Sequence, residues 1–344
     1  MLYKIEIFER DYTFRSFAPI EQPEIEYDYL TIQKTQVTCK SITASKGDFA
    51  HITDSTGAVV YQGIVDDTDT KKTGVTLQLQ PLLALFDTDI YFDRTQSARV
   101  ENFLKSAIIA NFSASGDAEQ NISGLTVETT SDTRGALNLK DNIHNLYEIM
   151  VSALTKHGIV VNVELRPQRK QLAVTIGRQT ATATIEADLP AIVEKSIIIG
   201  DSYGQLNKLT LVNEDNEAEQ ATYYLQQSGS VSTSNTNRIT PVFFGFDFVS
   251  VGTDETFAGA AYAKAYDKLA AQKYDNLIEV TAETGSGILP PSLALGTEIT
   301  VRSGGDVYQT ILTGYSRTER LTTLTMGCVR ADLTKRLILE RRNT

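Results

Sequence analysis

A self-match between the two ends of the chain constrains the fold more than any other feature of the sequence. At the constant offset that carries Ile52 onto Ile299, nine residues between positions 52 and 79 are identical to their counterparts. Because the match crosses two loops without a gap, it predicts two copies of one small antiparallel β-barrel in the chain. Two unrelated hairpins that share alternation and a turn glycine are the simpler alternative. The matched residues of the first copy are Ile52, Thr53, Gly57, Val60, Tyr61, Gln62, Ile64, Thr76 and Leu77.

Alternation of apolar and polar residues predicts strands at both ends of the chain. Residues 3–7 and 75–79 place an apolar side chain at every second position, which is typical of half-buried strands. The turn sequence at 54–57 predicts a hairpin over residues 48–65. Strand patterns return over residues 276–327.

Helical periodicity replaces this alternation in the middle of the chain. Apolar residues from Val100 to Ile108 recur with the spacing of one helix face. A second helix is expected to begin at a cap formed by Asp141 or Asn142 and to end at Gly158. Its apolar face consists of Ile143, Leu146, Tyr147, Met150 and Leu154.

These patterns predict a mainly β chain with an α+β insertion. The 344 residues exceed what one hydrophobic core usually organises, so several domains are expected. A hairpin is expected over residues 159–176, and further helices over 254–273 and 332–341. The predicted domains are a first β-barrel at 1–92, an inserted α+β domain at 93–190, strands that complete the barrel region at 191–250, and a helix with a second β-barrel and a short C-terminal helix at 251–344.

The charge balance limits the partners of the chain. It has 32 Lys and Arg against 43 Asp and Glu, a net charge of -11. Such a surface repels phosphate, so we expect no stable nucleic-acid binding, although DNA can pass nearby without adhering. No stretch approaches the ~18 apolar residues of a membrane span, and the N-terminus lacks the pattern of a signal peptide, so no integral membrane contact is expected.

No residue pattern predicts a catalytic, cofactor-binding or metal-binding site, and we expect no enzyme activity. Cys39 and Cys328 lack the spacing of metal or redox pairs, so both are expected to be reduced. The acidic run at 66–70 lacks the glycine and distal glutamate of a calcium loop and is interpreted as a solvated turn. Paired carboxylates for glycoside hydrolysis stay open, because the fold sets their spacing.

The three histidines favour structural positions. His51 is expected at the surface, because its counterpart in the repeat is Glu298. His144 and Glu148 are expected as an exposed pair on the second helix. His157 is expected in the last turn of that helix, where a partial positive charge suits the helix dipole.

Four short motifs carry a family resemblance: VYQGIV at 60–65, GTEITV at 296–301, ILTG at 311–314, and LTMG at 324–327 followed by Leu333-Thr334. They resemble the tail hub (baseplate hub) proteins of tailed bacteriophages and prophages, including the N-terminal part of tail-associated lysins. The resemblance implies a homotrimeric ring with two tube-like barrels per subunit, placed where the tail tube meets the tip of the virion. It implies partners among the tail tube or distal tail protein, the tape-measure protein and the tail fibre or tip proteins. Synthesis and assembly would take place in the bacterial cytoplasm.

Three functions are therefore considered. The first is a structural hub that connects the tail tube to the tip and lets DNA pass. The second is a cell-wall hydrolase with carboxylates in the α+β domain; the chain stops at residue 344, where many relatives continue into a peptidoglycan-cleaving domain, which argues against it. The third is a receptor- or carbohydrate-binding module with the Ser/Thr/Asn-rich loop at 228–238 as its contact edge.

Overall fold

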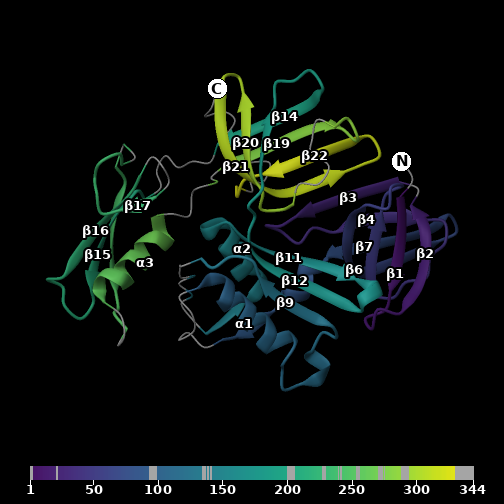
Figure 1. Ribbon diagram of the computed structural model, residues 1–344, viewed down its shortest axis with the longest axis horizontal. Helices are drawn as coiled ribbons and strands as arrows, with labels where there is room; N and C mark the ends of the chain where they lie inside the picture. Colours follow the sequence, from purple (N-terminus) through teal and green to yellow (C-terminus); the bar gives the residue numbers. More distant parts are fainter. Residues whose placement is uncertain are drawn as a thin grey trace.

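Strands dominate the computed structural model of the protein, and three α-helices lie among them in the part of the chain that the structure describes (Figure 1). The prediction of a mainly β chain with an α+β insertion is confirmed. The expected helix at 332–341 lies outside the described residues. The structure describes residues 3–20, 22–92, 99–133, 137, 139, 142–199, 206–226, 230–238, 240, 242–252, 256–269, 274, 276–287 and 294–329.

The first seven strands form what we call the N-terminal module. Their hydrogen-bonded order is β3-β4-β7-β6-β5-β1-β2. Apolar residues at every second position, such as Ile5, Ile52 and Leu77, fill one buried cluster, because alternate side chains of a strand point to the same face. The strands are β1 (Tyr3–Phe8), β2 (Phe14–Ile20), β3 (Gln22–Asp28), β4 (Thr35–Cys39), β5 (Phe49–Thr53), β6 (Val59–Lys71) and β7 (Gly74–Pro81).

Six later strands form the C-terminal module. Their hydrogen-bonded order is β14-β19-β22-β21-β20-β13. It matches the order β3-β4-β7-β6-β5-β1 of the N-terminal module strand for strand. One position differs in direction, because β13 runs parallel to β20 whereas β1 runs antiparallel to β5. The strands are β13 (Thr182–Glu186), β14 (Ile192–Ile199), β19 (Asn276–Glu283), β20 (Glu298–Ser303), β21 (Asp306–Arg317) and β22 (Leu321–Met326).

The internal repeat is confirmed at the level of residue pairing. The offset that relates Ile52 to Ile299 also carries the Asp67–Gln78 pair of β6 and β7 onto the Gly314–Thr325 pair of β21 and β22. A β-bulge interrupts both hairpins one residue before these pairs, at Asp66 and at its counterpart Thr313. Unrelated hairpins would not share both a register and a bulge position, so the simpler alternative is excluded.

The preceding hairpin, β5–β6 in one module and β20–β21 in the other, has a different strand register in the two copies. Ile52 pairs with Tyr61 in the N-terminal module, whereas Ile299 pairs with Thr310, two residues further along, in the C-terminal module. A shift of two residues keeps every side chain on its original face. The buried faces of β5 and β20 are therefore the same in both modules.

An α+β unit packs against both modules around one large apolar cluster. Helix α1 (Val100–Phe112) and the hairpin of β11 (Ile159–Arg166) and β12 (Gln171–Arg178) lie where the sequence predicts them. The remaining elements are 3-10 helix η1 (Leu82–Phe86), β8 (Asp89–Tyr91), η2 (Ala118–Gln120), β9 (Leu125–Thr129), β10 (Ile143–Asn145), α2 (Leu146–His157) and η3 (Pro167–Arg169).

The start of α2 corrects the sequence prediction. Asn145 caps the helix by accepting a hydrogen bond from the amide of Glu148, rather than Asp141 or Asn142. Ile143, which was placed on the apolar face of the helix, lies in β10 and is exposed. Gly158 ends the helix in a left-handed conformation with φ +67°, as predicted.

A small sheet with helix α3 (Phe257–Leu269) forms a fourth group. Its strands are β15 (Lys208–Asn213), β16 (Gln220–Leu225), β17 (Val231–Ser232) and β18 (Phe244–Val249), in the order β17-β16-β15-β18. Of the strands expected at 191–250 to complete the barrel region, β14 joins the C-terminal module, and β15 to β18 form a sheet of their own packed on α3. The predicted domain boundaries themselves stay a prediction.

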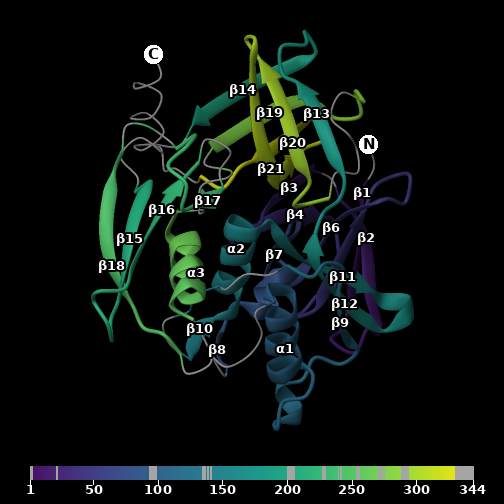
Figure 2. The same cartoon turned by 60° about the vertical axis from the view of Figure 1, so that its left-hand side comes forward.

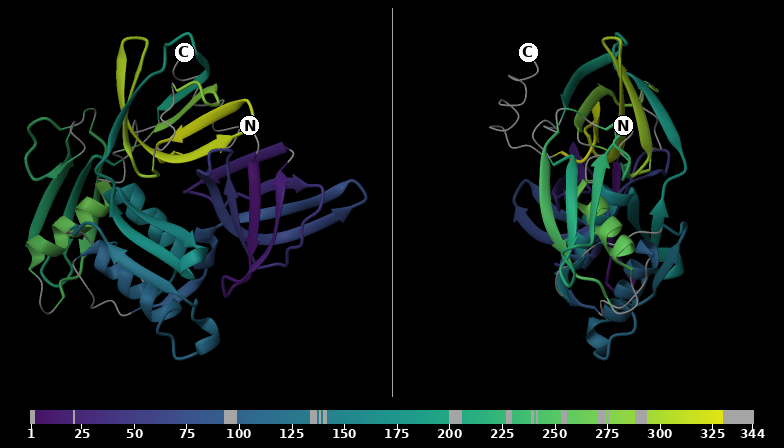
Figure 3. Two further views of the ribbon diagram at one scale, coloured as in Figure 1. Left: turned by 45° about the vertical axis from the view of Figure 1, so that its right-hand side comes forward. Right: turned by 90° about the vertical axis from the view of Figure 1, so that its left-hand side faces the viewer.

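The two modules share one continuous sheet. Strand β21 pairs with β3, from Gly314–Asp28 to Arg317–Ile25, and so joins the C-terminal module to the N-terminal module (Figure 3). The main path of this sheet ends at β14 and β2, and a branch from β21 through β20 ends at β13. Among the described residues, no helix is both long and apolar enough to cross a membrane.

Candidate functional site

Two tyrosines form the centre of the joint between the modules. Tyr27 on β3 stacks on Tyr315 on β21, with ring centroids 5.8 Å apart and planes 9° from parallel. The hydroxyl of Tyr315 donates to the carbonyl of Val60 at 2.9 Å. Burial raises the pKa of Tyr315 to about 12, so this donor keeps its proton at neutral pH. The joint is therefore built from packed rings and strand pairing.

His51 corrects a second sequence prediction, because it is not at the surface. Both ring nitrogens are buried and lack a hydrogen-bond partner among the described residues. Strand β11 of the α+β unit lies against this face of the N-terminal module, where Gln62 bonds to the backbone of Leu165. Burial lowers the pKa of His51 and favours the neutral ring. The repeat misled the prediction, because Glu298 is itself only partly exposed and accepts a hydrogen bond from Tyr274.

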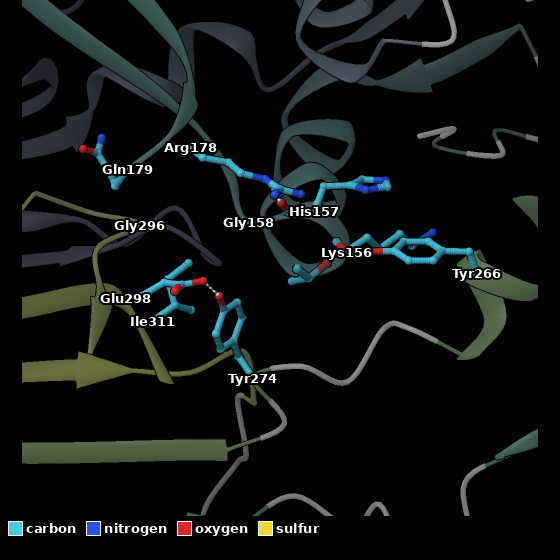
Figure 4. Close-up of a pocket in the computed structure, with 11 residues that line it drawn as sticks. Lys156, His157, Gly158, Arg178, Gln179, Tyr266, Tyr274, Gly296, Glu298 and Ile311 are labelled. Carbon is cyan, nitrogen blue, oxygen red and sulfur yellow. Dashed lines mark hydrogen bonds between the residues drawn. The ribbon is translucent and has the colours of Figure 1, made fainter. Parts of the chain in front are cut away.

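A pocket of about 220 Å³ lies where the α+β unit, helix α3 and the C-terminal module meet (Figure 4). The end of α2 contributes Lys156 and His157, and the ring of His157 stacks on Tyr266 of α3 at 5.6 Å. The side chain of Arg178 donates to the carbonyl of His157 at 2.8 Å. Gly296, Glu298 and Ile311 close the pocket from the C-terminal module.

One carboxylate of this pocket is held by a tyrosine. The Tyr274 hydroxyl donates to the Glu298 carboxylate (Figure 4), and burial, followed by this acceptor, raises the pKa of Tyr274. Gly296 has φ +81°, and a Cβ there would lie 2.1 Å from a methyl carbon of Val160, so the loop before β20 needs glycine to approach β11. Glu298 is the one carboxylate among the described lining residues. These contacts indicate a junction between units and do not provide the carboxylate pair of a glycosidase.

The other residues singled out in the sequence do not come together. His144 lies in β10 and not on α2, so the predicted helical pair with Glu148 is wrong. His157 is in the last turn of α2, as predicted. No three His, Cys, Asp or Glu side chains within the described ranges cluster closely enough to hold a metal ion.

The acidic run at 66–70 lies in the long strand β6 rather than in a turn. Its first residue, Asp66, occupies the bulge and accepts a hydrogen bond from Lys34 at 2.5 Å, with Lys46 at 3.4 Å. The Lys34 hydrogen bond is the main reason that the pKa of Asp66 is lowered. Asp67 and Asp69 are exposed on the far half of the strand.

The outer face of the small sheet exposes a row of aromatic side chains. Phe244, Phe246 and Phe248 alternate along β18 and are 66%, 69% and 52% exposed. Helix α3 covers the opposite face (Figure 2), where Asp247 pairs with Lys264 at 3.1 Å. Exposed apolar patches of this kind are typical of protein contacts. The spacing of two between these phenylalanines is the sequence signal that indicates this exposed row.

Solved structures of other proteins share this architecture, although sequence comparisons find no match. No protein-family model matches the sequence, and no curated protein matches it. Solved structures do match over almost the whole chain. A tail protein from Neisseria meningitidis superposes with a TM-score of 0.59 at 14% identity, covering 94% of this chain and 96% of that one. The chain has the fold of phage tail proteins.

Two further structures with this tail-protein fold match from end to end. A tail protein of prophage MuSo2 from Shewanella oneidensis gives a TM-score of 0.57 at 12% identity, covering 95% of this chain and 98% of that one. A prophage tail protein from Listeria monocytogenes gives 0.54 at 11% identity, covering 98% of each chain. The tail-protein fold thus includes both modules, the α+β unit and the small sheet.

Proposed function

We propose that the chain is a structural virion protein of a phage tail, which assembles as a homotrimeric hub ring between the tail tube and the tip. The observation that carries the proposal is the pair of modules with one strand order, joined side by side in one sheet. Two such modules in each of three copies give six similar units around an axis, and a ring of this kind fits a six-fold partner. The tail-protein fold supports the same role.

The ring is proposed to leave a passage for DNA. A net charge of -11 disfavours binding to phosphate groups, so DNA would slide through such a passage without adhering. The proposed partners are the tail tube or distal tail protein, the tape-measure protein, and the tail fibre or tip proteins. The virion tail tip is the proposed location, after assembly in the bacterial cytoplasm.

We propose no catalytic activity for the chain. The carboxylate of Glu298 in the pocket accepts a hydrogen bond from Tyr274, and the buried carboxylate Glu101 accepts hydrogen bonds from Ser131 and Thr133. Neither arrangement offers a free acid and base for hydrolysis. A zymogram on bacterial cell walls is expected to stay uncleared by the purified protein.

Sedimentation equilibrium or native mass spectrometry tests the proposed ring. We expect a species of three times the chain mass of 37.9 kDa, populated increasingly as concentration rises. A stable two-fold dimer, or a monomer at every concentration and in purified tails, would contradict the proposal. A gel-shift assay at low salt is expected to show no retained DNA.

A further inference from the structure

The joint within one chain uses one strand of each module, and each of these strands has a counterpart in the other module. Beyond Gly314, strand β21 pairs with β22 on one edge and with β3 on the other. Its counterpart, at the offset of the repeat, is the far half of β6, which pairs with β7 on one edge. Among the described residues, no strand pairs with the other edge of β6 beyond Ile64.

Strand β3 also has a counterpart, and the hydrogen-bond pairings identify it. Glu24 on β3 is linked through β4 to Gln78 on β7. Thr325 is the counterpart of Gln78, and it is linked through β19 to Ser196 on β14. Ser196 therefore corresponds to Glu24, and this offset relates residues 194–199 of β14 to residues 22–27 of β3. Within the described part of the chain, the second edge of β14 pairs with no strand.

A repeated side-chain contact supports this correspondence. Thr38 on β4 and Thr76 on β7 face each other with hydroxyl oxygens 3.3 Å apart. Their counterparts Thr281 and Thr323 face each other in the same way at 2.8 Å. Cross-strand threonine pairs of this kind stabilise a sheet. The two modules therefore correspond across four strands, and the counterparts β6 and β14 are left with open edges.

We propose that the far half of β6 in one copy pairs antiparallel with β14 of a neighbouring copy, and so repeats the joint seen within each chain. The intrachain pairs are Tyr315–Tyr27, Ser316–Glu26 and Arg317–Ile25. The offset that relates Gly314 to Asp67 replaces each β21 residue by its counterpart on β6. The offset that relates Glu24 to Ser196 replaces each β3 residue by its counterpart on β14. The resulting interchain pairs are Thr68–Ile199, Asp69–Ile198 and Thr70–Ile197. This register rests on the proposed trimer and specifies its contact.

The two open edges are suited to such a contact. Ile199 is 47% exposed at the position that Tyr27 occupies in the intrachain joint. Its partner Thr68 is β-branched, as is Ile199, and pairs of such residues are favourable across strands. The charged residues Asp67, Asp69 and Lys71 line the open half of β6. Charges on an edge strand discourage pairing with unrelated strands.

The contact is head-to-tail, because one copy offers β6 and its neighbour offers β14. Heterologous contacts of this type close into rings when the rotation permits. A ring of three copies has six joints, in which three intrachain joints alternate with three interchain joints. Thr68 and Ile199 fill less space than the tyrosine pair, so the interchain joint is the weaker of the two.

Cysteine cross-linking tests the register directly. Mild oxidation of the full-length T68C/I199C variant is expected to give disulfide-linked dimers and trimers on a non-reducing gel, because residues directly opposite each other lie within disulfide range. The T70C/I199C variant is two residues out of register, about 7 Å along the strand, and is expected to give at least tenfold less product. The E26C/S316C variant bridges the intrachain joint and serves as the positive control for oxidation. T68C and I199C alone control for the native cysteines.

A charge at the proposed contact provides a second test. I199D is expected to shift trimer to monomer in sedimentation equilibrium with an unchanged unfolding curve. V193D is the matched control, because Val193 lies on the same strand, is 58% exposed and falls outside the proposed pairs. V193D is expected to stay trimeric.

The outcomes separate this inference from the proposed function. A trimer in which E26C/S316C bridges but T68C/I199C does not would overturn the register and leave the ring standing. A trimer dissolved by V193D and kept by I199D would do the same. Absence of the trimer from solution and from purified tails would overturn both proposals.

Discussion

The side chain of Gln62 makes two hydrogen bonds with the backbone of Leu165, donating to its carbonyl at 2.8 Å and accepting from its amide at 2.9 Å. This pair ties β6 of the N-terminal module to β11 of the α+β unit. The counterpart of Gln62 in the repeat, Gln309, is exposed, and its side chain accepts a long hydrogen bond from Thr300 at 3.3 Å. The same residue type thus joins two units of the fold in the N-terminal module and is exposed in the C-terminal module.

The Q62A variant is expected to lose about 2–3 kcal/mol of unfolding free energy, because the amide and carbonyl of Leu165 lose their partners in a partly buried contact. Q309A serves as the matched control and is expected to lose less than ~0.5 kcal/mol. Urea denaturation followed by circular dichroism measures both. Equal losses would show that the contact with Leu165 does not hold the two units together.

Burial of His51 predicts a pH dependence of stability. Its pKa in the folded protein lies below the usual value of ~6.5, mainly because of desolvation. Its contribution to stability is therefore complete above pH ~6.5 and is lost as the pH falls towards the folded-state pKa. The H51F variant should lose this dependence between pH 7 and 5. The same slope in the variant and the wild type would contradict the assignment.

Glu101 predicts a second, more acidic dependence. Burial alone would raise the pKa of this carboxyl, but hydrogen bonds from Ser131 and Thr133 more than offset burial and lower it. Because the folded-state pKa is lowered, the stabilisation is present above the usual glutamate value of ~4.3 and is lost below it. In urea titrations from pH 6 to 3, E101Q should show a shallower decline than the wild type. T133V, which removes one of the donors, should lie between them.

Substitution in the aromatic row on β18 is expected to impair assembly without changing the stability of the fold. F246S is expected to change the unfolding free energy by less than ~0.5 kcal/mol, because the ring is exposed. It should reduce infectivity when supplied to tails that lack the wild-type protein, since exposed aromatic patches mark contact sites. L211S, on the buried face of the same sheet, is expected to cost several kcal/mol. Normal tail assembly and infectivity with F246S would show that this face of the sheet is not a contact site.

The repeat was readable from sequence because its matched residues lie in strands and turns that kept their spacing. The correspondence of β3 with β14 was not readable. Glu24 and Ser196 share no side-chain chemistry, and the insertions between the strands destroy any constant offset with the rest of the repeat. Only hydrogen-bond pairing, which joins residues far apart in the chain, relates the two strands.

The wrong predictions have physical causes of the same kind. His51 was assigned by analogy with Glu298, but packing against another unit decides burial and the repeat cannot predict it. Asn145 caps α2 although earlier residues also had capping side chains, because β10 pairs with β8 and holds the chain extended up to Asn145. Tertiary contacts thus decided both positions.

The bulge that both modules share at Asp66 and Thr313 has a geometric consequence. One extra residue on one strand bends a sheet locally, so both halves of the chain bend at equivalent points. In any tube lined by these modules, the wall would then bend at the equivalent point of each module. That bend would be built into each module by its own sequence, before any two copies meet.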